Sequence, residues 1–325
     1  MMKGKFIISL DFELHWGAPE KWDLSVKKDY FQSTRLIIPK VLNLFEKYRI
    51  SATWATVGFL FARSKQQLLD FSPKERPSYL NRNLSYYSLI DNHTVGDDEN
   101  SDPFHFAPSL IAEIIATPRQ ELGTHTFSHY YCNEAGQTVT QFELDLEASQ
   151  ALAKENFGLS LKSLVFPRNQ IKLEYLKAAE RCGIKVVRSN PDVWFWKGDS
   201  RANPLGRAID TLLPLSGPLS FPLSQPSNYS SVALLPASRF FRPYSKRESV
   251  IQGLKIQRIK NEMLYAARNN QGYHLWWHPH NFGYFPSQNL SQLEQILQHF
   301  VSLRSQFGFE SETMVDFYNN QSVKI

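Results

Sequence analysis

The sequence is short of cysteine and of long apolar runs. It has two cysteines in 325 residues, Cys132 and Cys182, and neither belongs to a Cys-x-x-Cys pair. A disulfide-built scaffold and a zinc knuckle are therefore excluded, and two free thiols are typical of a reducing compartment. No run approaches the ~20 apolar residues of a membrane span, and the first ten residues lack a secretory-type apolar region. We expect a cytoplasmic protein without a membrane span.

The chain also lacks a strong excess of either charge. Lys and Arg number 36 and Asp and Glu number 31, a formal net charge of +5. Nucleic-acid binding requires basic residues gathered on one face, and here most are scattered. The densest run is Arg239, Arg242, Lys246 and Arg247, which suits either an anionic group or a solvated helix start. The charge therefore argues against a nucleic-acid partner.

Apolar patterning predicts strands and helices in alternation. The expected strands are Lys5–Leu10, Ile50–Gly58, Glu121–Thr124, Leu161–Phe166, Ile184–Arg188, Tyr273–Trp277 and Thr313–Phe317. The expected helices are Thr34–Tyr48 (with Pro39 in its first turn), Val139–Phe157, Leu173–Arg181, Glu248–Arg268 and Leu290–Leu303. Two proline-containing stretches, about 64–108 and 203–243, interrupt the pattern and are expected to be mostly loop. Such alternation predicts a mainly parallel sheet, open or closed into a barrel.

Polar residues follow two of the early strands, where α/β proteins gather their chemistry. Asp11 and Glu13 stand two apart at the end of a strand and point to the same side. His125 and His129 stand four apart, and on a helical turn they would share one face and suit a metal. Two histidines and a carboxylate form the catalytic type of zinc site, which keeps a position open.

Two later segments add candidate catalytic groups. His278 ends an apolar strand and is a candidate acid or base, because imidazole titrates near neutrality. Arg168 directly follows another strand and could orient a carboxylate through charge-assisted hydrogen bonds.

Together these segments resemble the polysaccharide deacetylase family, the metal-dependent sugar N-deacetylases of the carbohydrate esterase family 4 type. The order matches: an acidic strand end, histidines four apart, a Pro/Arg segment, and a late apolar strand ending in histidine. The commonest family form has two adjacent aspartates, whereas here Phe12 separates Asp11 from Glu13. The segment Phe166-Pro167-Arg168-Asn169 also departs from the usual Arg-x-Pro order.

The resemblance implies an α/β fold, a single distorted, incomplete (β/α) barrel of seven or eight strands over residues 1–325, with insertions at about 64–108 and 203–243. It implies one divalent metal ion, zinc, held by Glu13, His125 and His129. Asp11 looks like the general base, with Arg168 positioning it, and His278 looks like the general acid, with His280 the nearest substitute. The residues expected to contact substrate are Tyr130 (through its backbone N–H, on the oxyanion), Asp192, Trp194 and His280.

The implied function is removal of an acetyl group from an N-acetylated sugar or glycan, with a cytoplasmic precursor of surface polysaccharide as the expected substrate. A first alternative is hydrolysis of a non-sugar C–N bond, allantoinase-like or amidohydrolase-like, the latter using His278 and His280 as a ligand pair. A second is a non-catalytic glycan-binding relative. The complete set of acid, ligands and late histidine argues against that last alternative.

Overall fold

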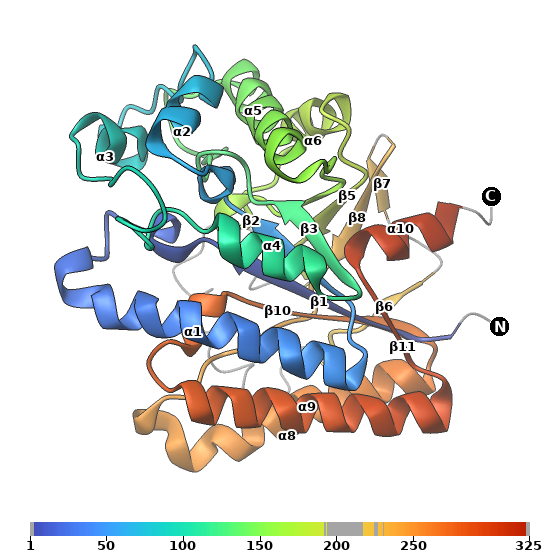
Figure 1. Ribbon diagram of the computed structural model, residues 1–325. Helices are drawn as coiled ribbons and strands as arrows, with labels where there is room; N and C mark the ends of the chain where they lie inside the picture. The colour runs from blue at the N-terminus through green and yellow to red at the C-terminus, as the bar shows by residue number, and fades with distance from the viewer. Residues whose placement is uncertain (1–2, 192, 194–216, 224–226, 230, 323–325) are drawn as a thin grey trace.

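The computed structural model describes residues 3–191, 193, 217–223, 227–229 and 231–322 (Figure 1). Its strands are β1 Lys5–Phe12, β2 Ala52–Thr56, β3 Gln120–Thr124, β4 Ser163–Leu164, β5 Val186–Ser189, β6 Phe221–Pro222, β7 Ser227–Tyr229, β8 Val232–Pro236, β9 Arg239–Phe240, β10 Gln271–Trp277 and β11 Glu310–Glu312. Its helices are α1 Leu24–Tyr48, α2 Lys65–Phe71, α3 Tyr87–Asp91, α4 Pro108–Ala116, α5 Val139–Phe157, α6 Leu173–Arg181, α8 Gln252–Arg268, α9 Pro286–Phe307 and α10 Met314–Ser322.

Eight strands form a nearly closed, parallel barrel, as predicted. The order β10-β1-β2-β3-β4-β5-β8 is parallel throughout. The chain then passes directly from β8, which pairs with β5, to β9, which pairs with β10. At this seam the Ser238 N–H donates to the His274 carbonyl (2.8 Å) and the Phe241 N–H donates to the Trp276 carbonyl (2.8 Å). One short segment therefore joins the two ends of the sheet.

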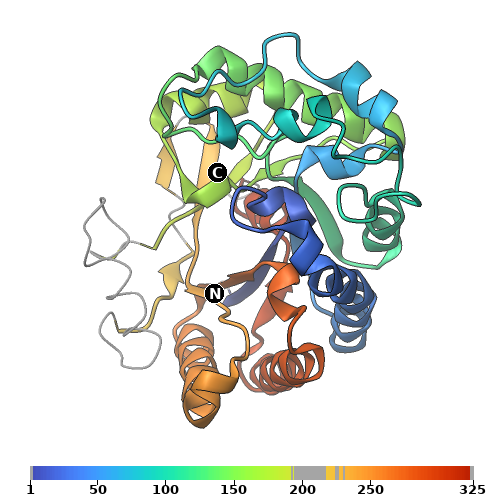
Figure 2. The same cartoon turned by 90° about the vertical axis from the view of Figure 1, so that its left-hand side faces the viewer.

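Helices cover the barrel in groups (Figure 2). Helices α1, α8 and α9 pack together on one side, and α5 packs on α6 on another. Helix α1 begins at Leu24, earlier than predicted, and contains Pro39 in its interior rather than its first turn. An internal proline costs about 3 kcal/mol, but apolar residues on both sides of it, such as Phe31 and Phe45, are fully buried. Tertiary packing therefore outweighs the local preference.

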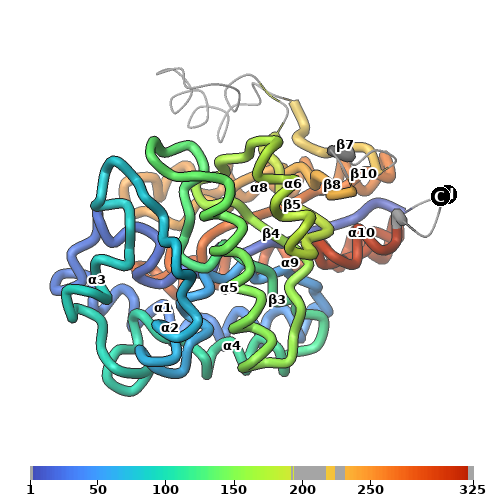
Figure 3. Tube along the Cα trace, turned by 90° about the horizontal axis from the view of Figure 1, so that it is seen from above, coloured from blue at the N-terminus to red at the C-terminus, as the bar shows by residue number. Residues whose placement is uncertain are grey.

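The stretch 64–108 is an ordered attachment and holds α2 and α3. It lies at the end of the barrel opposite α10 (Figure 3), where the parallel strands have their carboxyl ends. Its last residues hold the segment after β1: His105 Nε2 lies 2.8 Å from His15 Nδ1, and the Trp16 indole N–H donates to the His105 carbonyl at 2.9 Å.

The structure corrects two other expectations. About half of the described residues in the stretch 203–243 lie in the short strands β6 to β9, and prolines such as Pro222 and Pro236 stand at strand ends. Residues 314–317 belong to α10 and not to a strand. A reciprocal cap explains this, because Thr313 Oγ1 accepts from the Asp316 N–H (3.1 Å) while Asp316 Oδ2 accepts from the Thr313 N–H (3.4 Å).

The basic run is also partly internal. Arg239 is buried and donates to both carboxylate oxygens of Glu262 on α8, at 2.8 and 2.7 Å. Arg242 pairs with Glu248 at 3.2 Å. Arg239 is therefore part of the packing between α8 and the barrel, whereas Lys246 and Arg247 are exposed. Within the described residues no helix has the length and apolar character needed to span a bilayer.

The buried Arg239–Glu262 pair yields a stability prediction. Replacing Glu262 by Ala removes the buried carboxylate that accepts from Arg239 and from the Tyr273 hydroxyl, and it should lower the free energy of unfolding by about 3–5 kcal/mol. Denaturant unfolding followed by circular dichroism measures this. Glu143→Ala is the control. It removes the carboxylate of the Arg181–Glu143 pair, which is more exposed than the Arg239–Glu262 pair, and it should change the free energy of unfolding little. Equal losses of unfolding free energy in Glu262→Ala and Glu143→Ala would contradict a special structural role for the buried Arg239–Glu262 pair.

Candidate active site

The carboxyl end of β1 supplies two buried carboxylates. Asp11 and Glu13 are 2% and 4% exposed, and both face the interior of the barrel mouth. Burial alone raises the pKa of Glu13, but the charge of His278 and hydrogen bonds with His125 and His129 outweigh it and hold this pKa well below its usual range. The same balance holds for Asp11, where Arg188 outweighs burial and lowers the pKa. Both carboxylates are therefore ionised at neutral pH.

The two histidines that follow β3 lie on a tight turn that is not helical, contrary to expectation. Thr126 and His129 have left-handed backbone conformations, with φ of 66° and 58°. Asp145 of α5 holds the turn: its carboxylate accepts from the Phe127 N–H (2.7 Å) and the Ser128 N–H (3.1 Å). The buried Asp145 carboxylate thus accepts hydrogen bonds from backbone N–H groups that would otherwise be buried without a partner. By holding the turn, it also fixes the directions of the two imidazoles.

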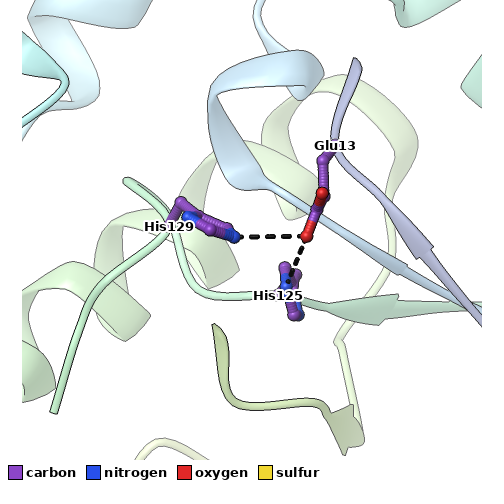
Figure 4. A group of neighbouring side chains, drawn as sticks. All are labelled: Glu13, His125 and His129. Atoms are coloured by element: carbon purple, nitrogen blue, oxygen red, sulfur yellow. Dashed lines mark hydrogen bonds and ion pairs between the residues drawn. The ribbon is translucent and has the colours of Figure 1, made fainter. Parts of the chain in front are cut away.

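Glu13, His125 and His129 form one compact group (Figure 4). Glu13 Oε1 lies 3.0 Å from His125 Nε2 and 3.2 Å from His129 Nε2, and all three side chains are buried. His125 Nδ1 lies 2.8 Å from the Val165 carbonyl, an obligate acceptor, so Nδ1 carries a proton and Nε2 is the nitrogen left to ligate a cation. Burial lowers the pKa of His129 despite its contact with Glu13, which favours the neutral, ligating form. These residues fit a divalent cation of the kind that nitrogen and oxygen ligands hold.

Arg188 is the residue that engages Asp11. Its guanidinium donates to both carboxylate oxygens, at 2.6 and 2.8 Å, and lies over the Trp276 ring at 4.2 Å. The Arg168 guanidinium pairs with Glu20 at 2.7 Å, so the expectation that Arg168 positions Asp11 is wrong. The sequence held a signal for Arg188, because it ends an apolar strand of the same parallel sheet as Asp11.

Asp11, Glu13 and His278 make a second cluster of candidate ligands. His278 Nε2 lies 3.6 Å from both Asp11 Oδ2 and Glu13 Oε1. Because Arg188 occupies both oxygens of Asp11 and brings a positive charge, a cation is favoured in the group with His125 and His129. Asp11 and His278 are left for proton transfer.

His280 lies deeper than His278. Its Nδ1 is 3.8 Å from Glu13 Oε2, and burial lowers its pKa to about 3. The His278 side chain is 25% exposed and can meet a substrate from solvent. Among the described residues, no candidate ligand group contains both histidines, so the geometry does not favour the amidohydrolase-like pair.

Of the expected substrate contacts that remain, Tyr130 is the one that the structure describes. The Tyr130 N–H donates to Thr126 Oγ1 at 2.7 Å, which commits it to the turn and not to an oxyanion. The Tyr130 side chain is buried against Phe142. Asp192 and Trp194 lie outside the described residues.

Comparisons with known proteins match part of the chain to a family. Residues 29–187 match the family model named polysaccharide deacetylase. That segment holds His125 and His129. The other residues of the site lie outside it, namely Asp11, Glu13, Arg188 and His278. No curated protein matches the chain in sequence.

Solved structures share the fold. A Mycobacterium smegmatis protein described as a polysaccharide deacetylase aligns over 100% of this chain and 92% of its own, with a TM-score of 0.61 and 11% identity. A Pseudomonas aeruginosa protein described as a probable polysaccharide deacetylase aligns over 97% and 89%, with a TM-score of 0.56 and 10% identity. The 4-alpha-glucanotransferase of Thermococcus litoralis aligns over 99% of this chain but 41% of its own, with a TM-score of 0.56 and 10% identity.

At such low identity the structural likeness establishes the barrel, and the family model adds the sequence evidence over a little under half of the chain. The matched segment belongs to the polysaccharide deacetylase family, and the resemblance seen in the motifs is confirmed.

Proposed function

We propose that this chain is a metal-dependent hydrolase that removes the acetyl group from an N-acetylated sugar or glycan. One observation carries the proposal: Glu13, His125 and His129 converge beside an arginine-held Asp11. His278 Nε2 lies 3.6 Å from both Glu13 Oε1 and Asp11 Oδ2. A cation site, a base and an acid therefore meet at one strand end. Family membership supports the deacetylase role.

Asp11 acts as the general base in this proposal. Its carboxylate is ionised, and the bidentate contact with Arg188 fixes its orientation toward the barrel mouth. A positioned base of this kind contributes about 10²–10⁴-fold to rate. When bound, a divalent cation, zinc in our proposal, would polarise the amide carbonyl and lower the pKa of water to about 7.

His278 acts as the general acid. Cleavage of the amide bond leaves acetate and a nitrogen that must gain a proton to depart as the amine. An imidazolium, the protonated form of the histidine ring, can deliver a proton near neutral pH, whereas Asp11, held ionised, cannot. Water supplies the oxygen of the acetate, so protons and atoms balance across the two residues.

The sugar that carries the acetyl group is also part of the proposal. We favour a precursor of surface polysaccharide, handled in the cytoplasm. A panel of free, nucleotide-linked and polymeric N-acetyl sugars, with acetate release as the readout, tests this. Turnover of allantoin or another non-sugar amide in place of every sugar would overturn it.

Metal content tests the ligand set. We expect the purified protein to bind about one equivalent of Zn²⁺, and His125→Ala to lose that ion because two ligands rarely suffice for a catalytic site. Elemental analysis after dialysis measures this. His93→Ala is the control. It removes an exposed histidine and should bind as much Zn²⁺ as the unaltered protein does. Full metal content in His125→Ala would refute the site.

Substitution of the proposed base should separate chemistry from binding. Asp11→Asn should lower kcat about 10²–10⁴-fold while Zn²⁺ content is retained, because Asp11 is held by Arg188 and not needed as a ligand. Asp70→Asn, at an exposed helix position, is the matched control. Loss of metal together with activity would instead make Asp11 a ligand.

The acid can be identified by changing the leaving group. His278→Ala should lower kcat about 10²–10⁴-fold on an N-acetyl sugar. It should lower kcat much less on 4-nitrophenyl acetate, because that leaving group departs without a proton. His280→Ala should not show this difference between the two substrates, because its ring lies behind His278 against Trp22. A selective loss in His280→Ala would reverse the assignment.

A further inference from the structure

The two ligand histidines are oriented by different means. His125 Nδ1 faces a backbone carbonyl, which can only accept. His129 Nδ1 lies 3.1 Å from the Tyr131 hydroxyl, which can donate or accept. The Tyr131 contact alone therefore leaves the proton of His129 undetermined.

The hydrogen bonds beyond Tyr131 remove that ambiguity. The Tyr131 hydroxyl lies 2.5 Å from the Tyr86 hydroxyl, and Tyr86 donates to Glu20 Oε2 at 2.8 Å. The Glu20 carboxylate can only accept, so Tyr86 must donate its single proton outward. Tyr86 then accepts from Tyr131, and the Tyr131 oxygen is left to accept from His129 Nδ1–H. The direction of every bond follows from the carboxylate at the far end.

Arg168 completes this arrangement. Its guanidinium pairs with Glu20 at 2.7 Å and lies over the Tyr131 ring at 4.0 Å. The Tyr86 ring in turn stacks on His129, with 5.7 Å between centroids and 15° between planes. Tyr86 and Tyr131 are 1% and 0% exposed, so water does not replace these partners.

We propose that Tyr131, Tyr86 and Glu20 form a hydrogen-bonded relay that fixes the proton of His129 on Nδ1 and thereby sets how tightly the site holds a divalent cation. Arg168 is a positioning residue at its outer end. The inference rests on the proposed function only in requiring a cation at Glu13, His125 and His129. It gives the attachment 64–108 a role, since Tyr86 comes from that stretch.

Hydroxyl deletions test the relay with little change of shape. Tyr131→Phe removes the acceptor for His129 and should weaken Zn²⁺ binding about 10–100-fold. Tyr86→Phe leaves the Tyr131 hydroxyl without its acceptor, so its proton can point at His129. This variant should weaken Zn²⁺ binding about 10-fold. Tyr87→Phe deletes the hydroxyl of a neighbouring tyrosine, also buried, and is the matched control. Competition with a chromophoric chelator gives the affinities, and thermal melts of the metal-free variants show that each is folded.

The outcomes are distinct. Weakened binding in Tyr131→Phe and Tyr86→Phe with Tyr87→Phe unchanged supports the relay. Equal affinity in all variants overturns it while the metal site stands. Failure of the unaltered protein to bind Zn²⁺, or unchanged binding in His129→Ala, overturns the proposed function and the relay with it.

Discussion

The burial of the Glu13 carboxylate is the constraint on which the site depends. A carboxylate out of water is costly unless positive groups and donors surround it. Here His125, His129 and His278 lie within 3.6 Å of one of its oxygens. With Asp11 and Arg188 cancelling each other, the centre retains one negative charge if the imidazoles are neutral. A bound cation would neutralise that charge. The contacts that orient the imidazole nitrogens toward one point are consistent with such a site.

Those contacts come from parts of the chain that touch no reacting group. Asp145, from a helix on the outside of the barrel, fixes the turn between the two histidines. The attachment at 64–108 acts twice, through His105 behind the end of β1 and through Tyr86 behind His129. A barrel of parallel strands places side chains at one rim, but it does not by itself determine their rotamers or tautomers. The outer layer supplies that second level of order.

Local patterning predicted a mainly parallel sheet, and the resemblance to the deacetylase family implied the barrel and the choice of Glu13, His125 and His129 as ligands. Polar residues at the carboxyl ends of parallel strands must meet at one rim, so Glu13, His125, His129 and His278 could be assembled without coordinates. The arginine could not, since whether Arg168 or Arg188 reaches Asp11 depends on barrel curvature and on where Glu20 stands. The interior Pro39 and the strands β8 and β9 were missed for a related reason, namely that tertiary packing and barrel closure outweigh local propensity.

The seam of the barrel has a kinetic consequence. Ser9 Oγ lies 3.1 Å from the Arg188 guanidinium and 2.8 Å from His274 Nε2, and His274 Nδ1 faces the Pro236 carbonyl at 3.2 Å. The orientation of Asp11 is therefore linked to the segment that closes the sheet. Contacts between residues so distant in the chain form late in folding, because the entropy of loop closure must first be overcome. Partly folded chains should carry the histidine turn before they carry an aligned base, and activity should return only with the last cooperative step.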